Sequence, residues 1–163
     1  MSRSDAKDEI FLSIACELGQ LGTCNRGKVG AVITHSGRCV SWGYNGAPPG
    51  LPHCDEVNHG LSLGPWFDNK GEDERVLALE RAVAISGCRN ATHAEANAIA
   101  FAARQGISTE GGTLYVERSP CDICARLLIA AGIVRVVFSE SYRDTQPIEL
   151  LQQAGVEVTH APR

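Results

Sequence analysis

The stretch TLYVERSPCDICARLLIAAGIVRVVFS, residues 113–139, decides the fold class because it contains a strand, a helix and a second strand in succession. TLYVE and VRVVFS are short runs typical of buried strands, and Pro120 favours a helix that begins at Cys121 and continues to Ala131. A further helix is expected around Ile148 to Ala154, followed by a short strand, VEVT. Strands that alternate with helices predict an α/β domain whose sheet is covered by helices on both faces.

The first half of the chain predicts a helix and a hairpin. Apolar residues recur at intervals of three and four between Asp5 and Leu21, which indicates a helix. The runs KVGAVIT (28–34) and RCVSWGY (38–44) are strand-like, and HSG between them is typical of a hairpin turn. Two more helices are expected, at Glu74–Ile85 and His93–Arg104.

The connection over residues 45–73 is rich in glycine, proline and histidine and is longer than ordinary loops. Loops of this length are often functional. The 163 residues suffice for one domain with a hydrophobic core, so a single domain is expected over residues 1–163.

Composition and charge exclude several classes of protein. No apolar run approaches the roughly 18 to 20 residues of a membrane span, and the N-terminal MSRSDAKDEI lacks the apolar core of a signal peptide. A cytoplasmic protein without a membrane partner is therefore expected. The net charge of −4 and the absence of a basic run disfavour nucleic acid as a partner, whereas a small anionic ligand needs only one or two local cations.

The seven cysteines favour metal binding or catalysis over a disulfide framework in a reducing compartment. Cys121 and Cys124, spaced as C-x-x-C at a predicted helix start, can direct both sulfurs to one point. His93, in THAEANAI (92–99), stands at another predicted helix start and can supply a third ligand. One imidazole and two thiolates bind zinc and leave a fourth tetrahedral position open, as in catalytic zinc sites.

Glu95, two residues after His93, need not bind the metal and can instead accept and deliver a proton. Each motif alone is weak, because a lone C-x-x-C is often redox-active or structural and a lone H-x-E is usually chance. Together, H-x-E followed by P-C-x-x-C is the signature of the zinc deaminases.

With KVGAVI, GYNGAPPG, HAEANAI and SPCDICARLL in this order, the chain resembles the deoxycytidylate deaminases of bacteria and their phages. The resemblance extends from about Cys24 to Val158. It implies a three-layer α/β/α cytidine-deaminase-like fold with a mixed five-stranded sheet, and usually a homohexamer. It also implies the reaction, in which dCMP and water give dUMP and ammonia for thymidylate synthesis.

The same resemblance assigns roles to individual residues. His93, Cys121 and Cys124 would hold the catalytic zinc, and Glu95 would be the proton shuttle. The other implied contacts are to the substrate, with Asn45 and Tyr142 near the nucleoside and Arg26 and Lys28 near its phosphate. Each has a plainer alternative: Asn45 as a turn residue, Tyr142 as a packing residue, and the two cations as solvated surface charges.

A second, structural zinc is implied by cysteines that match the pattern of relatives. Its ligands would be Cys24, Cys54, His59 and Cys88, where His59 replaces a cysteine of some relatives. The alternative is that these cysteines are reduced and partly buried. Cys16 and Cys39 are expected to serve packing only.

Three residues bear on specificity or regulation. Relatives usually have threonine where this chain has Glu117, so this carboxylate either changes which base or sugar is accepted or faces away from the site. Tyr44, in GYNG, and Arg104 match positions connected with activation by dCTP and inhibition by dTTP, although an arginine near a helix end is also a favourable cap.

Other functions remain open from the sequence. The substrate could be a 5-substituted dCMP or another amino-heterocycle, as in the tRNA adenosine and riboflavin-pathway deaminases. The acidic net charge disfavours tRNA as the substrate. A non-catalytic zinc module for protein interaction would not need Glu95.

Overall fold

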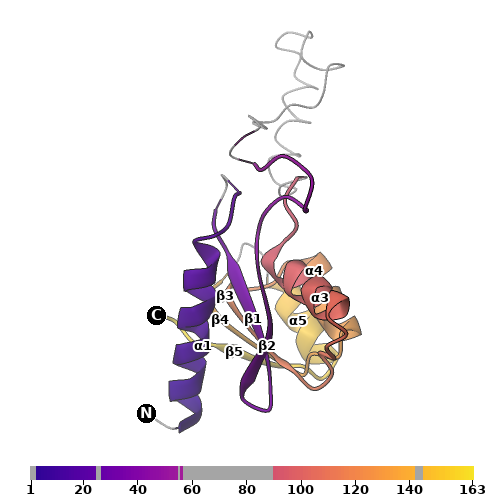
Figure 1. The fold of residues 1–163 in the computed structure, drawn as a ribbon. Coiled ribbons are helices and arrows are strands. Elements are labelled where there is room, and N and C mark those ends of the chain that lie inside the picture. The colour runs from indigo at the N-terminus through magenta and orange to yellow at the C-terminus, as the bar shows by residue number, and fades with distance from the viewer. Residues whose placement is uncertain (1–2, 25–26, 55, 57–89, 142–144) are drawn as a thin grey trace, which may run out of the picture.

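The computed structural model describes residues 3–24, 27–54, 56, 90–141 and 145–163. Within these ranges a five-stranded sheet has the order β2-β1-β3-β4-β5 and packs against helices on both faces (Figure 1). The elements are α1 (Arg3–Gly19), β1 (Gly30–His35), β2 (Arg38–Tyr44), α3 (Ala94–Arg104), β3 (Thr113–Arg118), α4 (Asp122–Ala130), β4 (Arg135–Glu140), α5 (Gln146–Gln153) and β5 (Glu157–His160).

The sheet is mixed, as expected. β1 runs antiparallel to β2 and β3, whereas β3, β4 and β5 are parallel to one another. β1 and β2 form the predicted hairpin, and both residues of its turn have positive φ, 51° at Ser36 and 72° at Gly37. Positive φ at both positions matches the twist of the flanking strands. The parallel strands are connected through α4 and α5, which explains why strand and helix signals alternate in the second half.

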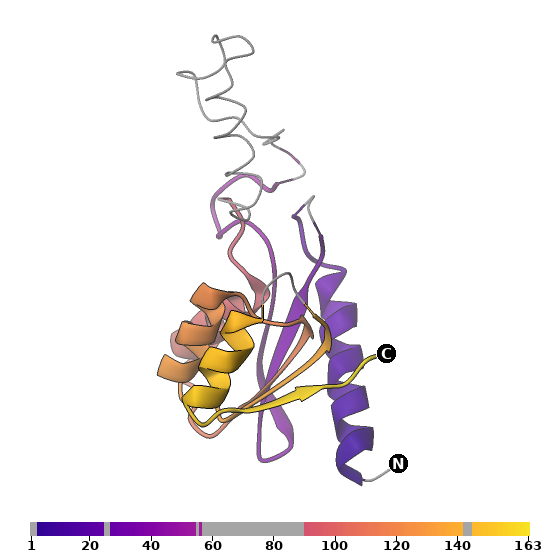
Figure 2. The ribbon, with the colours of Figure 1, turned by 180° about the vertical axis from the view of Figure 1, so that it is seen from behind.

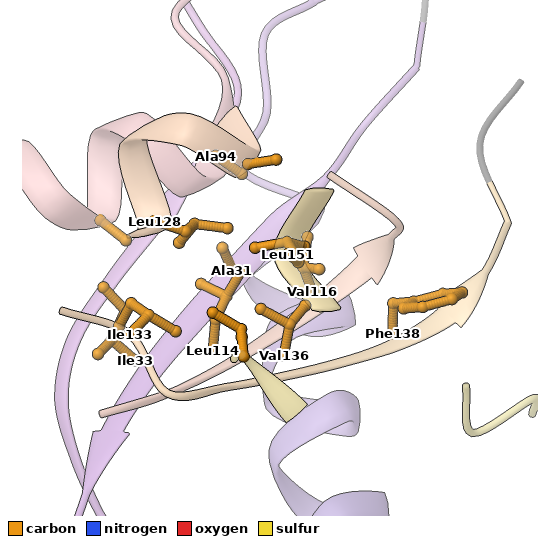
Figure 3. Close-up of a cluster of buried hydrophobic side chains, with 13 residues drawn as sticks. Ala31, Ile33, Ala94, Leu114, Val116, Leu128, Ile133, Val136, Phe138 and Leu151 are labelled. Carbon is orange, nitrogen blue, oxygen red and sulfur yellow. The ribbon is translucent and has the colours of Figure 1, made fainter. Parts of the chain in front are cut away.

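Side chains alternate across the sheet and divide the core into two layers. Leu114 and Val116 of β3 pack with residues of α3, α4 and α5, among them Leu128 and Leu151 (Figure 3). Tyr115, between them, points to the other face and packs with Leu12 and Ala15 of α1. Among the described helices, the views from both sides show α1 on one face and α3, α4 and α5 on the other (Figures 1 and 2). The three-layer α/β/α architecture is therefore confirmed.

α1 is held to the sheet by close packing and by a largely buried ion pair. A Cβ atom at Gly30 would overlap the Ala15 carbonyl oxygen, so the helix backbone rests directly on β1. Arg135 of β4 donates to both carboxylate oxygens of Asp8, at 2.8 and 2.7 Å, and the Tyr115 hydroxyl donates to Asp8 at 3.0 Å. The hydrogen bonds from Arg135 lower the pKa of Asp8, and burial together with the Asp8 contact raises the pKa of Tyr115 to about 12.

Most predicted elements are present, with ends that differ by at most two residues. The predicted helix at Glu74–Ile85 and most of the long connection lie outside the described residues. The expectation that Cys39 serves packing is wrong, because its side chain is exposed at the start of the edge strand β2, whereas Cys16 is half-buried. None of the helices within the described ranges is both long and apolar enough to cross a membrane.

Candidate active site

His93 and Cys121 lie at the end of the sheet where β3 terminates, because α3 and α4 both begin there. His93 is the N-cap residue of α3 and Cys121 that of α4, each with extended backbone. α4 follows the carboxyl end of β3 through Ser119 and Pro120. β1 is antiparallel to β3, so the first residues of β1 lie at the same end of the sheet. The last residues of β2, which pair with them, lie there too.

His93, Cys121 and Cys124 bring three metal-binding atoms together. The Nδ1 atom of His93 is 3.4 Å from the Cys121 sulfur and 3.5 Å from the Cys124 sulfur, and all three ligand atoms lie within 4.8 Å of one another. Tetrahedral zinc, with Zn–S near 2.3 Å and Zn–N near 2.0 to 2.1 Å, requires N···S separations of about 3.5 Å. The donor set and its spacing therefore fit one zinc ion.

The two thiols are electrostatically coupled. The hydrogen bond with Cys124 lowers the pKa of Cys121 to about 4, and the same contact raises the pKa of Cys124. The free backbone N–H groups of a helix start add partial positive charge that favours anionic sulfur. A divalent cation favours the thiolate form of both groups, because metal ligands must be deprotonated.

Glu95 is a buried carboxylate in the first turn of α3, and only 5% of the residue is exposed. Burial raises its pKa, while its own backbone N–H and the neighbouring His93 oppose that shift. Its side chain contacts the Cys124 thiol. A buried carboxyl group with a raised pKa, next to three metal-binding atoms, is suited to accept and return a proton.

α3, which carries Glu95, lies unusually close to β2. A Cβ atom at Gly43 would be 2.5 Å from both the Ala94 oxygen and the Ala98 nitrogen, so only glycine allows this approach. Two hydrogen bonds join the same elements: the Asn97 side chain donates to the Tyr44 carbonyl at 2.7 Å, and the Ser41 hydroxyl donates to the Ala98 carbonyl at 2.6 Å.

The sequence did not predict these contacts between α3 and β2. Asn97 is visible there only as one amide in a helix of small and apolar residues. Nothing in the local pattern indicates which strand lies beneath it.

The Asn45 side chain, expected to contact the substrate, is engaged with the backbone. Its Oδ1 accepts from the Val29 amide at 2.9 Å and its Nδ2 donates to the Gly27 carbonyl at 2.7 Å. The next residue, Gly46, pairs with Thr92, directly before His93. The segment therefore borders the site, and a substrate contact of Asn45 stays a prediction.

Other predicted contacts are dispersed. Lys28 is exposed and its ammonium donates to the Gln20 carbonyl at 2.8 Å. Arg104 is exposed in the last turn of α3. Tyr44 stacks on Trp42 with ring centroids 6.1 Å apart. Arg26 and Tyr142 lie outside the described residues.

The residues expected at a second zinc site are described in part. Cys24 and Cys54 are both buried, and the Asn90 side chain is 3.6 Å from the Cys54 sulfur. His59 and Cys88 lie outside the described residues. Over the part of the chain that the structure covers, His93, Cys121 and Cys124 form the one group of three suitable ligands.

Glu117 lies on the α1 face of the sheet, with Tyr115. A Cβ atom at Gly19 of α1 would be 3.4 Å from its carboxylate. Burial raises the pKa of Glu117, and the nearby Glu140 adds to the shift. α3 and α4, which carry the three clustered ligands, pack on the opposite face, so the structure favours the alternative in which Glu117 faces away.

Comparison with known proteins agrees with this geometry. A family model described as "Cytidine and deoxycytidylate deaminase zinc-binding region" matches residues 5–140. The deoxycytidylate deaminase of Enterobacteria phage T2 is 39% identical over 178 residues, covering 96% of this chain and 93% of the phage protein. That of Mycobacterium phage D29 is 41% identical over 138 residues, covering 85% of this chain and 97% of that protein. The crystal structure of dCMP deaminase from cyanophage S-TIM5, in complex with dCMP and dUMP, matches with a TM-score of 0.75 and 29% identity over 99% of both chains.

Proposed function

The chain belongs to the cytidine and deoxycytidylate deaminase family, and from this premise we propose that it is a zinc-dependent hydrolase that converts dCMP and water to dUMP and ammonia. This reaction would supply dUMP for thymidylate synthesis. The observation that carries the proposal is the buried Glu95 carboxylate beside a His93, Cys121 and Cys124 group with zinc spacing. A structural zinc module has no use for that carboxylate.

Each step of the proposed reaction can be given to a residue of the site. His93, Cys121 and Cys124 hold zinc, which when bound supplies Lewis-acid activation of water. Glu95 receives a proton from the water whose oxygen bonds to C4 of cytosine, and gives this proton to N3. Glu95 then moves the second water proton from the new hydroxyl to the amino nitrogen. The C4–N bond breaks, which leaves a carbonyl at C4 and releases ammonia.

The raised pKa of Glu95 suits both halves of this cycle. A carboxylate with an ordinary pKa would accept the water proton less readily, and a strongly basic group would not release it. Burial of Glu95 in the first turn of α3 is the largest cause of this shift.

The substrate contacts are proposed from the family resemblance and from position. Asn45 would meet the nucleoside at the sheet edge, with Tyr142 near the base and Arg26 and Lys28 near the phosphate. The Gly46 pairing with Thr92 supports this placement for Asn45, because it sets the segment next to His93. KM values for dCMP and for deoxycytidine, measured on single alanine variants of these four residues, would test it.

The assembly, regulation and location are proposed as well. Trp42 and Phe101 are 39% and 41% exposed with ring centroids 5.9 Å apart, which is apolar surface that a homohexamer would bury. We place dCTP and dTTP as effectors acting through Tyr44 and Arg104, in a cytoplasmic enzyme whose residues 1–163 form one domain. Analytical ultracentrifugation with and without each nucleotide would test the assembly and the effectors together.

The second zinc is proposed with Cys24, Cys54, His59 and Cys88 as ligands. The burial of both described cysteines supports it, since thiolate ligands of structural zinc are shielded from solvent. Elemental analysis should find two zinc ions per chain, and one in Cys54→Ser. A single zinc in both proteins would contradict this site.

The deciding experiment measures ammonia release by zinc-loaded protein from dCMP, CMP, deoxycytidine, 5-methyl-dCMP and dAMP. We expect preference for dCMP, and a loss of roughly 10²- to 10⁴-fold in Glu95→Gln with zinc retained. Glu149→Gln, the same chemical change on the exposed face of α5, is the matched control and should be fully active. Preference for 5-methyl-dCMP would replace the substrate, and no turnover of any compound with zinc bound would refute the proposal.

A further inference from the structure

The end of β2 and the loop that follows it are tied to the start of α3 at two points that lie on either side of His93. Before His93, Thr92 and Gly46 exchange backbone hydrogen bonds at 2.8 and 3.2 Å. After it, the Asn97 side chain donates to the Tyr44 carbonyl at 2.7 Å. Between these ties are His93 and Glu95 on the helix side and Asn45 on the loop side.

The loop passes the constraint on to a third segment. Asn45 holds residues 27–29 through both ends of its side-chain amide, and its backbone N–H donates to the Val29 carbonyl at 3.0 Å. Its backbone carbonyl accepts from the Thr23 amide at 3.1 Å. Thr23, residues 27–29 and residues 44–46 are therefore positioned together.

Asn97 of α3 connects these segments to the helix that carries Glu95, through its side-chain hydrogen bond to Tyr44. Its reach depends on Gly43, because a Cβ atom there would be 2.9 Å from the Asn97 Cβ and would push the helix outward. We propose that Asn97 is a positioning residue whose amide fixes the segment Tyr44–Gly46, at the end of β2 and just beyond it, and through this segment residues 27–29, relative to His93 and Glu95.

This role differs from merely attaching α3 to the sheet, and Ser41 offers the comparison. The Ser41 hydroxyl joins the same strand to the same helix, in a buried hydrogen bond of 2.6 Å to the Ala98 carbonyl. Ser41 lies three residues before Tyr44, so this bond does not hold the loop. Removing it should loosen the helix on the sheet while leaving segments 27–29 and 44–46 in place.

The first readout is independent of catalysis. Hydrogen exchange of zinc-loaded wild type, Asn97→Ala, Asn97→Asp and Ser41→Ala would be followed at the amides of Val29, Asn45 and Gly46. Both Asn97 variants should exchange roughly fivefold faster at these amides, as expected for the loss of one hydrogen bond, and Ser41→Ala should match wild type. Asn97→Asp keeps the size of the side chain and loses the donor, so it separates the hydrogen bond from packing.

The second readout is kinetic and rests on the proposed deaminase function. KM for dCMP should rise roughly fivefold in both Asn97 variants, with zinc content unchanged and kcat altered by less than about twofold. Ser41→Ala should keep the wild-type KM even if its melting temperature falls.

The two hypotheses can fail separately. Wild type that binds zinc and deaminates none of the nucleotides would refute the function, and the exchange rates would still decide the role of Asn97. Unchanged exchange at Val29 and Asn45 in Asn97→Ala would overturn that role. Equal effects of Asn97→Ala and Ser41→Ala on exchange would also overturn it, because both residues would then only attach the helix.

Discussion

Asp8→Asn should destabilise the fold by about 3 kcal/mol, because it removes the negative member of a largely buried ion pair. Asp8 is 7% exposed and accepts two hydrogen bonds from Arg135 and one from Tyr115. Removing one partner of a buried pair typically costs about 3 to 5 kcal/mol. The lower end applies here, since Arg135 keeps its 2.8 Å hydrogen bond to Glu157 and its side chain is 20% exposed.

Thermal unfolding followed by circular dichroism would measure this loss. For a chain of this size 1 kcal/mol corresponds to about 2 to 4 °C, so the melting temperature should fall by roughly 6 to 12 °C. Glu9→Gln, the same chemical change at an exposed position of the same helix, should shift it by less than about 2 °C. Equal shifts in Asp8→Asn and Glu9→Gln would refute the conclusion that the ion pair anchors α1.

The pH dependence gives the sign of the effect. Because Arg135 lowers the pKa of Asp8 in the folded state, the stabilisation is present above the unfolded pKa of about 3.9 and is lost as the pH falls through the folded pKa. The difference between wild type and Asp8→Asn should therefore be constant near neutral pH and shrink in acid below about pH 4. A difference that persists unchanged in strong acid would contradict this origin.

Three further outcomes follow from the packing. The pKa of Tyr115 is raised to about 12, so its stabilisation is present below pH 10 and lost as the pH rises through 12; Tyr115→Phe should remove this alkaline loss in urea titrations. Gly43→Ala places a Cβ atom 2.5 Å from the Ala94 oxygen, so it should lower the free energy of unfolding by about 1 to 3 kcal/mol. It should also lower zinc affinity, measured by competition with a chelator. Unchanged zinc affinity would show that α3 can move without displacing His93. Glu117→Thr should leave the ratio of dCMP to 5-methyl-dCMP turnover unchanged, since Glu117 lies against α1, and a changed ratio would place it in the substrate site.

Much of the fold was predictable because its signals are local. The hairpin is indicated by two strand-like runs around HSG, and the parallel part of the sheet by the alternation of strands and helices after residue 112. The three clustered ligands could also be predicted from the sequence, since Pro120 marks one helix start and the H-x-E and C-x-x-C spacings mark the reactive positions.

What the sequence did not reveal depends on contacts between distant segments. Asp8 and Arg135 are 127 residues apart, and each alone is an ordinary charged residue. The direction of Glu117 follows from strand parity only once the face covered by α1 is known. The closeness of α3 to Gly43 and the contacts of Asn97 require knowledge of which strand lies under the helix.

The N-cap positions of His93 and Cys121 determine where the chain tolerates changes in length. Both residues are located by the points at which α3 and α4 begin, and those points are set by packing on the sheet. Residues added to the connection 105–112, between α3 and β3, would extend a surface loop and leave both helix starts where they are. One residue inserted between His93 and Glu95 would instead turn Glu95 by about 100° around the helix axis, away from the ligand group. Insertions should therefore accumulate in that loop, while the spacings within H-x-E and C-x-x-C stay fixed.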